Sequence, residues 1–429
     1  MTRRIAVVGA GMAAARFAER FQALGGDAEV TLYGAEPRAP YNRALLADVL
    51  TGRYAADDLT LLSGDAQLRT GCEVTALDTV AHTLRLADGA HVPYDDLVLA
   101  TGAEPVLPGG ADTADTLRPA DGGHAPYDEP APATGVGPAA GPALPPGGAH
   151  MVRTAADFER LAAAAARARR AVVIGGGVLG VSVARALASR GLPVTIVHQA
   201  SHLVERELDG PAGELLRGVL AGLGVEVRTG STVRAVHGDG RVELSGGHVL
   251  DADLVVAACG VTPRTALARA AGLPVRTGVL VDDRLSCAPG VYAIGDCAEH
   301  RDRTHGTAGA AWEQADVLAA RLSGAAPDAA YAGSRPYARL SAGPLEYAAF
   351  GDPAADEGGD EGGLDVLRIA DATRGSYKKL VLRGDRIAGA VLLGDLSTVG
   401  ALARAYERDE IVPADPFHLL TSPTSQGAS

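Results

Sequence analysis

A glycine-rich turn near the start of the chain lies between a short apolar strand and a helix. The motif is Gly9-Ala10-Gly11-Met12-Ala13-Ala14, which follows a β-rich run at 5–8 and precedes apolar residues at helical spacing up to Leu24. Gly9 permits the tight turn, Gly11 lets the backbone approach a pyrophosphate, and the small Ala14 lets the helix pack on the strand. The helix N-terminus attracts phosphates, so the motif predicts a βαβ unit that binds a nucleotide.

The same pattern returns in the middle of the chain. An apolar run at 171–174 leads into Gly175-Gly176-Gly177-Val178-Leu179-Gly180, and a helix pattern follows at 181–189. Two further stretches, 95–102 and 252–260, resemble each other, and each indicates an apolar strand that ends at glycine. The chain therefore carries two similar nucleotide-binding units, and the predicted fold is α/β with two Rossmann-like dinucleotide-binding domains.

The residue near the end of the second strand of such a unit normally binds the adenosine ribose. In the first unit Gly34 stands near that position, and Glu36 follows as the candidate carboxylate; the alternative is a solvated turn carboxylate. In the second unit the strand ends at His198, which is neither the acid that favours NADH nor an arginine that favours NADPH. The choice between the two nucleotides therefore stays open.

A third motif, Val291-Tyr292-Ala293-Ile294-Gly295-Asp296-Cys297, is an apolar strand that ends in Gly-Asp. An aspartate at the carboxyl edge of a sheet is well placed to bind a ribityl hydroxyl of a flavin; the alternative is a loop-capping role. Disulfide-handling flavoenzymes need two cysteines together beside the flavin, but Asn42 and Arg43 occupy the stretch where they would lie. We therefore expect Cys297 to be a buried structural thiol.

Charge and composition exclude several classes of function. The net charge is −13 and no Lys/Arg run stands out, which argues against a nucleic-acid partner. The four cysteines are too dispersed for a disulfide framework, and the eleven histidines do not cluster at metal-ligand spacing, so we expect a cytoplasmic protein without a metal site. We expect neither a signal peptide nor a membrane span, because the chain opens on an apolar strand and no apolar run is long enough.

At 429 residues the chain is too long for a single core. A hairpin pattern at 375–395 predicts a small third α+β domain, a stretch at 109–148 dense in Pro, Gly, Ala and Asp predicts a surface insertion, and 356–363 indicates a loop. The predicted divisions are an FAD-binding domain at 1–108 and 271–330, an insertion at 109–150, an NAD(P)-binding domain at 151–270, a C-terminal domain at 331–416 and a frayed tail at 417–429.

The order of these motifs resembles that of the FAD-dependent pyridine-nucleotide oxidoreductases with two dinucleotide folds, over about residues 3–322. Within that superfamily, further segments look like the N-terminal half of the large subunit of NAD(P)H-dependent nitrite reductase and the electron-transfer subunit of assimilatory nitrate reductase. Rubredoxin reductases and the ferredoxin reductases of aromatic dioxygenase systems are similar but more distant. The segments that carry the resemblance are 36–46, 312–315, 377–382, 389–395 and 413–416.

The resemblance implies that FAD and NAD(P)H are the cofactors, and it implies a set of contacts to them. For FAD these are Arg43 at the phosphates, Val74 at the adenine through its backbone, Thr101-Gly102 over the pyrophosphate, Asp296 at the ribityl chain and Ala308 near the flavin ring. Gly260 would abut the pyridine nucleotide.

Three departures from the family matter. The nitrite reductase subunit continues into cysteine-rich iron–sulfur and siroheme domains, whereas this sequence ends at Ser429, so we expect that it does not itself reduce nitrite. The family usually has a glutamate near the nicotinamide, two residues after the second glycine motif, and that residue is Ser182 here. The insertion at 109–148 is also longer than the family's usual link.

The expected function is electron transfer from NAD(P)H through FAD to a separate redox protein. Hydride transfer to a flavin needs stacking and alignment more than an acid or base, so we expect no catalytic side chain. A nitrate or nitrite reductase system is the first choice of acceptor, and a ferredoxin or rubredoxin is the alternative. An NADH oxidase, peroxidase or disulfide reductase is disfavoured by the missing cysteine pair. The alternative of another class is a slow, NADH-binding redox sensor.

Overall fold

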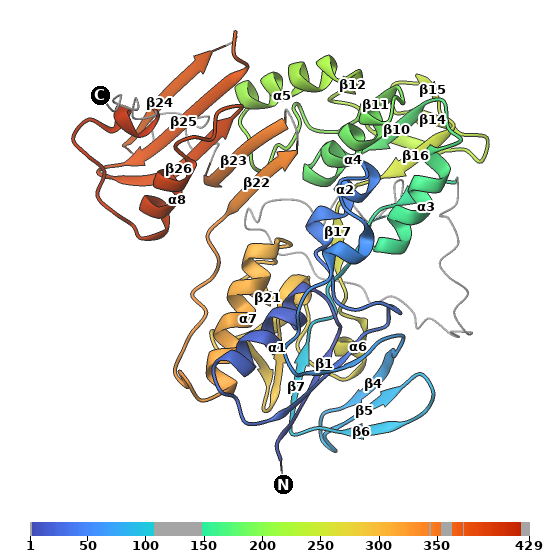
Figure 1. The fold of residues 1–429 in the computed structure, drawn as a ribbon, viewed down its shortest axis with the longest axis vertical. Coiled ribbons are helices and arrows are strands. Elements are labelled where there is room, and N and C mark those ends of the chain that lie inside the picture. The colour runs from blue at the N-terminus through green and yellow to red at the C-terminus, as the bar shows by residue number, and fades with distance from the viewer. Residues whose placement is uncertain (1, 107–147, 343–344, 353–362, 372, 422–429) are drawn as a thin grey trace, which may run out of the picture.

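The computed structural model describes residues 2–106, 148–342, 345–352, 363–371 and 373–421 (Figure 1). Three units are each built on a sheet of their own, two of them largely parallel and one antiparallel. The predicted α/β class, with a smaller α+β unit at the C-terminal end, is therefore confirmed. Nearly all of the predicted insertion at 109–150 and of the predicted loop at 356–363 lies outside the described residues.

A six-stranded sheet carries the first glycine turn. Its strand β1 pairs in parallel with β2 on one side and β7 on the other, and β20 continues the parallel order beyond β7. All residues of β7 are buried, as expected for a strand covered on both faces. In spatial order the strands are β19 Ser286–Ala288, β20 Val291–Ala293, β7 Asp96–Leu99, β1 Arg4–Val8, β2 Glu29–Tyr33 and β3 Gln67–Arg69.

Helices α1 (Met12–Ala23) and α7 (Ala308–Leu322) lie side by side against this sheet (Figure 1). Small residues of α7, such as Ala315, share a core with Phe17 of α1. A bidentate ion pair from Arg16 to Asp316, with Nε 2.7 Å from Oδ1, joins the two helices at their rim. This packing places the first turns of both helices near one edge of the sheet.

The second glycine turn lies on a five-stranded parallel sheet. β10 has β11 on one side and β16 on the other, which repeats the arrangement of β2, β1 and β7. The helices of this unit are α3 (Ala155–Ala165), α4 (Val178–Ser189) and α5 (Gly210–Gly222). In spatial order the strands are β12 Val225–Arg228, β11 Val194–Val197, β10 Ala171–Ile174, β16 Leu254–Ala257 and β9 His150–Met151.

A five-stranded antiparallel sheet forms the C-terminal unit, at the upper left of Figure 1 beside α5. Helix α8 (Val399–Glu407) packs against it, and the hairpin predicted at 375–395 is the β25–β26 pair. In spatial order the strands are β22 Tyr337–Ala342, β23 Leu345–Gly351, β26 Arg386–Leu393, β25 Ser376–Arg383 and β24 Leu364–Asp371.

The chain stays packed beyond the point where a frayed tail is expected. The short helix η4 (Pro416–Leu419) leads to Leu420, which is 1% exposed in the core under α8. Lys378 Nζ donates a hydrogen bond of 3.0 Å to the Leu420 carbonyl. The interpretation of a loose tail therefore does not hold for 417–421, and the remainder of that tail lies outside the described residues.

Short elements connect the units. β8 (Ala103–Pro105) and β17 (Val261–Pro263) pair antiparallel between the first two units.

Within the described ranges, no helix combines the length and apolar character that a membrane span needs. The other elements are α2 Leu46–Leu50, α6 Ala266–Ala270, η1 Arg43–Leu45, η2 Ala56–Leu59, η3 Gly295–Cys297, β4 Val74–Asp78, β5 Thr83–Leu86, β6 His91–Pro93, β13 Val233–Val236, β14 Arg241–Leu244, β15 Val249–Asp251, β18 Val279–Val281 and β21 Ala298–His300.

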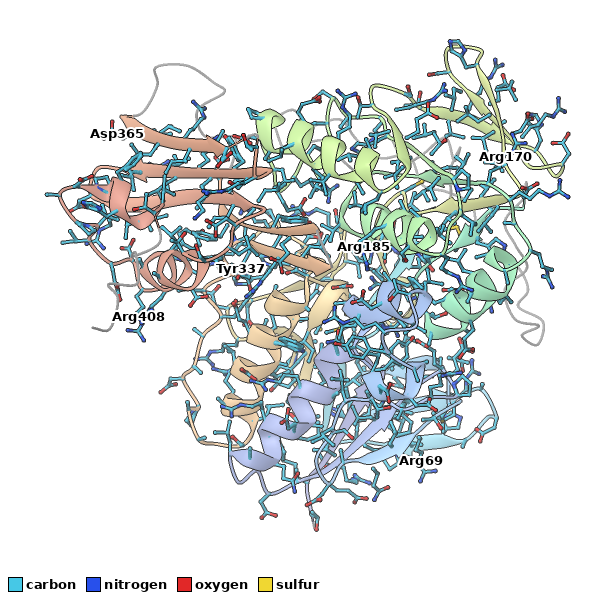
Figure 2. All side chains as sticks on the ribbon, turned by 45° about the horizontal axis from the view of Figure 1, so that its top comes forward. Arg69, Arg170, Arg185, Tyr337, Asp365 and Arg408 are labelled. Carbon is cyan, nitrogen blue, oxygen red and sulfur yellow. The ribbon has the colours of Figure 1, made fainter. Side chains whose placement is uncertain are left out.

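A buried ion pair fixes α2 of the first unit on α4 of the second. Arg185 of α4 is labelled in Figure 2. Its Nη2 lies 2.8 Å from Asp48 Oδ1, and both side chains are 10% exposed. Arg190, at the end of α4, donates to the Leu50 carbonyl at 3.1 Å. The two nucleotide-binding units therefore meet through specific polar contacts as well as through apolar packing.

Candidate functional site

The predicted positions of the first unit meet at one edge of its sheet. β1, β2, β7 and β20 run parallel, so their carboxyl ends lie together. Open α/β sheets bind ligands at this edge, at the point where neighbouring connections diverge, and β1 occupies that point here. The residues that follow these strands are Gly9 after β1, Glu36 after β2, Thr101-Gly102 after β7 and Gly295-Asp296 after β20.

The two glycines of the first turn serve different needs. Gly9 has a φ of +111°, and a Cβ there would collide with the Ala100 carbonyl oxygen, so the fold itself requires glycine. At Gly11 φ is −99°, and no further heavy atom of the described residues lies within 4 Å of where a Cβ would stand. This open cradle at the N-terminus of α1 fits the pyrophosphate of a dinucleotide, which needs close approach to the backbone.

The second turn repeats this geometry. Gly175 has a φ of +106°, and a Cβ there would collide with the Ala258 carbonyl oxygen, as at Gly9. Around Gly177 the space for a Cβ is again free of described atoms within 4 Å. The two turns are therefore geometric equivalents, and a second dinucleotide fits the N-terminus of α4 in the same way.

The other predicted positions of the second unit lie at the edge that carries Gly177. Val178 and Leu179 form the first turn of α4. A Cβ at Gly180 would collide with the Gly175 carbonyl oxygen in the glycine turn. In the first unit the corresponding position accommodates Ala14, which is fully buried. Gly260 follows β16 with a φ of +101°, and its carbonyl accepts a 3.0 Å hydrogen bond from the backbone of the 101–106 segment.

Two side chains hold the carboxylate of Glu36 beside the first edge. Its Oε2 accepts a 2.7 Å hydrogen bond from the Tyr41 hydroxyl, and its Oε1 pairs with Arg43. Burial raises the pKa of Tyr41 to about 12, so this hydroxyl remains a donor across the physiological range. Glu36 and Arg43 are 32% and 25% exposed, which leaves both accessible to the hydroxyls and phosphates of a nucleotide.

Val74 reaches the first edge from the small β4–β5–β6 sheet. The Cys72 amide donates to the Gly34 carbonyl at 2.7 Å, and the Gly71 amide donates to the Glu36 carbonyl at 2.9 Å. These bonds lay residues 71–74 beside the end of β2. A backbone contact from Val74 to an adenine held near Glu36 is compatible with this placement.

Arg153 is a site residue that the sequence analysis misses. It precedes α3, where Thr154 and Asp157 form a capping box, and its Nη2 pairs with Asp296. Its carbonyl accepts a 3.2 Å hydrogen bond from Arg43 Nη1, so Arg153 links Arg43 with Asp296. Its Nε is buried and has no hydrogen-bond partner among the described residues, which marks a donor that a bound phosphate or hydroxyl would satisfy.

Helix α7 brings a second unpredicted residue, Gln314, to this edge. Its buried side chain accepts a 2.7 Å hydrogen bond from the amide of Gly295, which has a φ of +77°. Ala308 begins α7, and its N-cap Thr307 makes no side-chain cap. The first amides of a fifteen-residue helix are therefore free to interact with a polar atom near Ala308.

The Thr101-Gly102 loop ties the first edge to the second unit. Thr101 Oγ1 donates to the Arg264 carbonyl at 2.9 Å, and the Arg264 amide donates to the Gly102 carbonyl at 2.9 Å. Ser182 lies in α4 of the second unit, where its Oγ donates to the Val178 carbonyl at 2.7 Å. Its hydroxyl is thus bonded within α4, so position 182 supplies neither charge nor acid.

Cys297 has the surroundings of a structural thiol. It is fully buried, and its Sγ lies 3.3 Å from the Ile294 carbonyl oxygen. Desolvation raises the pKa of Cys297, and it raises the pKa of Cys259 to about 11 and that of Cys287 to about 12. None of the four cysteines, which all lie in the described ranges, forms a disulfide. These three thiols are therefore poor nucleophiles at neutral pH.

An open cavity of about 650 Å³ lies where the three units meet. Thr307, the loop after β11 and the start of β22 line it. Tyr337 at its rim stacks on Phe350, with ring centroids 6.0 Å apart, and is 40% exposed (Figure 2). Because Thr307 precedes Ala308, the cavity adjoins the position predicted for the flavin ring.

Replacing Arg153 by alanine should weaken FAD binding by about 10- to 100-fold, because a charge-assisted hydrogen bond contributes roughly 1.5–3 kcal/mol. Titration of the apoprotein with FAD, followed by flavin fluorescence, measures this. Arg217→Ala is the control, since Arg217 pairs with Glu214 on the exposed face of α5. An unchanged dissociation constant for the Arg153 variant would remove this residue from the site.

Residues 3–315 match the family described as pyridine nucleotide-disulphide oxidoreductase, and residues 336–410 match the rubredoxin NAD+ reductase C-terminal domain. A nitrite reductase [NAD(P)H] of Bacillus subtilis (strain 168) is 33% identical over an aligned length of 440 positions, gaps included, which covers 99% of this chain and 50% of that protein. The ferredoxin–NAD(+) reductase component of the anthranilate 1,2-dioxygenase system of Burkholderia cepacia is 35% identical over 343 residues, 76% of either chain.

A crystal structure of a ferredoxin reductase from Rhodopseudomonas palustris has the same fold, with a TM-score of 0.78 and 24% identity over 96% of both chains. The chain spans about half the length of the nitrite and nitrate reductase relatives that it matches, namely 50%, 48%, 42% and 47%.

Proposed function

The chain belongs to the pyridine nucleotide-disulphide oxidoreductase family, and we propose that it is an NAD(P)H:acceptor oxidoreductase with FAD at the first glycine turn. NAD(P)H would bind at the second turn, and the electrons would leave for a separate redox protein. The family membership agrees with the superfamily that the order of motifs predicts. The proposed division is that predicted from the sequence: an FAD domain at 1–108 and 271–330, an NAD(P) domain at 151–270 and a C-terminal domain at 331–416.

The observation that carries the proposal is the pair of equivalent turns. Gly11 and Gly177 both lie at helix N-termini, and neither is required to be glycine by its protein neighbours. A ligand that approaches the backbone at each position explains both residues. Two such cradles, on two sheets joined through β8 and β17, support two dinucleotides on one chain.

Each charged side chain at the first edge would bind a different part of the FAD molecule. Glu36 would accept hydrogen bonds from the adenosine ribose, and Arg43 and Arg153 would donate to the phosphates. Asp296 would accept from the ribityl chain, with Gly295 held in place by Gln314. Bound FAD supplies the chemistry, since it takes up a hydride and can release electrons singly. The protein's own part is to hold and align the two nucleotides.

The names of the relatives support two acceptors. A nitrite reductase and an assimilatory nitrate reductase electron transfer subunit, both of Bacillus subtilis, match nearly the whole of this chain, which favours an acceptor in nitrate or nitrite assimilation. The second candidate is a ferredoxin or rubredoxin, which the 35% identity to a ferredoxin–NAD(+) reductase component favours. A cytoplasmic location is part of the same proposal. The cavity beside Thr307 would give either acceptor access to the flavin.

Reduction of the bound flavin tests the proposal. The purified protein, loaded with FAD, should be yellow, and stopped-flow mixing with NADH or NADPH should bleach the flavin within seconds. A protein that cannot be loaded with FAD would defeat the proposal. Flavin that bleaches only over minutes at saturating nucleotide would support the slow redox sensor. Rapid consumption of NADH with oxygen alone would support an oxidase.

A further inference from the structure

The second unit lacks the usual acid at the end of its second strand, yet the structure brings a carboxylate to that position. β11 ends at Val197, and the next residue, His198, is 6% exposed. The Glu205 carboxylate, seven residues later, lies beside His198, with Oε2 2.9 Å from Nε2. A carboxylate therefore stands at the tip of β11 although the strand itself ends in a histidine.

The backbone fixes this arrangement from both sides of Gly176. The Gly176 amide donates to His198 Nδ1 at 3.1 Å, and its carbonyl accepts from the Val204 amide at 2.9 Å. A Cβ at Gly176 would stand only 2.8 Å from His198 Cγ, so glycine makes room for the imidazole. Val204 is fully buried with a φ of +55°. The segment that carries Glu205 is thus bonded directly to the second glycine turn.

These bonds also fix the roles of the two side chains. Because Nδ1 accepts a backbone N–H, the proton of the neutral imidazole is on Nε2 and is donated to Glu205. Both nitrogens of His198 are therefore engaged, and the ring is not free to bind a phosphate. Glu205 is 32% exposed, so its carboxylate can still accept hydrogen bonds from a ligand.

Burial acts to raise the pKa of Glu205, but the His198 hydrogen bond and nearby positive charge outweigh it, and the net effect lowers the pKa. The group is thus a carboxylate at neutral pH. Among the described residues, neither of two nearby arginines forms an ion pair with the Glu205 carboxylate. Arg228 pairs with Glu226, at 2.8 Å, and Arg206 lines the cavity at the junction with the C-terminal unit.

We propose that Glu205, positioned by His198, binds the adenosine ribose of the pyridine nucleotide and makes this chain specific for NADH over NADPH. The inference rests on the proposed function, because it assigns the second turn to a pyridine nucleotide. A carboxylate at this place accepts the 2′-hydroxyl of NADH and repels the 2′-phosphate of NADPH. The residue that selects NADH therefore lies in the loop after β11 and not at the end of the strand.

Binding of ADP-ribose and of 2′-phospho-ADP-ribose, measured by isothermal titration calorimetry on the FAD-loaded full chain, tests this without turnover. We expect ADP-ribose to bind at least about 100-fold more tightly. Glu205→Gln should reduce that ratio by about tenfold, equivalent to about 1.4 kcal/mol. His198→Asn, which keeps a backbone acceptor but is too short to reach Glu205, should reduce it in the same direction. Glu214→Gln is the control, because Glu214 pairs with Arg217 on the exposed face of α5.

The outcomes distinguish a failure of the NADH specificity from a failure of the proposed function. If neither probe binds, the assignment of the second turn to a nucleotide fails, and the proposed function fails with it. If both bind equally, or the phosphorylated probe binds more tightly, only the NADH specificity is overturned. If Glu205 and His198 only held the loop in place, Glu205→Gln and His198→Asn would weaken the binding of both probes equally. An unchanged ratio in both variants would therefore also overturn the inference.

Discussion

Gly11→Ala should leave the chain folded and lower its affinity for FAD by about 10- to 100-fold. A Cβ at position 11 meets no further described atom within 4 Å, and a φ of −99° is accessible to alanine, so the apoprotein accommodates the change. The methyl group would instead occupy the space through which a pyrophosphate approaches the α1 amides. Loss of one charge-assisted hydrogen bond, roughly 1.5–3 kcal/mol, gives the expected factor.

The equivalent position of the second turn provides the matched variant. Gly177→Ala should keep FAD bound but raise the concentration of NADH needed for half-maximal flavin reduction by a similar factor. Flavin absorbance after gel filtration measures the first effect, and stopped-flow reduction measures the second. Gly9→Ala, in contrast, should impair folding, since φ is +111° and the Cβ collides with the Ala100 carbonyl. If Gly177→Ala released the flavin and Gly11→Ala did not, the assignment of FAD to the first turn and of NAD(P)H to the second would have to be reversed.

The features that the sequence predicts well are those that neighbouring residues determine. Each glycine turn lies directly between its strand and its helix, so periodicity and spacing were enough to find Gly9 and Gly175. The parallel sheets then follow, because two βαβ units bury apolar strands of four or five residues. The β25–β26 hairpin is predictable for the same reason, since a short turn joins alternating apolar residues.

Contacts between distant segments are the part that the sequence does not predict. Arg153 is separated by 143 residues from Asp296 and by 110 from Arg43, and nothing in its local sequence marks it except the capping box that follows. Glu205 is likewise positioned by a contact that the local pattern does not reveal, although it is only seven residues from His198. The strand end at His198 suggests that no acid is present, and only the folded loop shows a carboxylate there.

Lys379 illustrates the same limit in the C-terminal unit. It is in the middle of β25 and is fully buried, although lysine is among the residues least often found inside. Its Nζ lies 3.3 Å from Asp209 Oδ2, and the neighbouring Tyr377 hydroxyl donates to the same oxygen at 2.7 Å. Asp209 is the N-cap of α5 and accepts from the Ala212 amide at 3.1 Å. One carboxylate therefore satisfies a lysine, a tyrosine and a helix terminus.

Asp209→Ala should accordingly destabilise the C-terminal unit by about 3–5 kcal/mol, because removing one partner of a buried ion pair is strongly destabilising. Loss of the α5 cap contributes about 1 kcal/mol to this effect. Tyr377→Phe is the graded comparison, since it removes one hydrogen bond and no charge and should cost roughly 1.5–3 kcal/mol at most. Glu214→Gln, on the exposed face of α5, should change stability by about 0.5 kcal/mol or less.

Unfolding of a chain with several units is not a single transition, so the measurement must resolve them. Hydrogen exchange in increasing urea, followed separately in α5, β25 and the first sheet, does so. In the Asp209 variant, exchange in α5 and β25 should speed up at low urea, while that of β1 and β7 should stay unchanged. FAD binding should also persist, because the groups around Gly11 and Asp296 lie in the first unit and make no contact with Asp209. Equal losses in Asp209→Ala and Tyr377→Phe would show that the buried charge of Lys379 does not depend on this carboxylate.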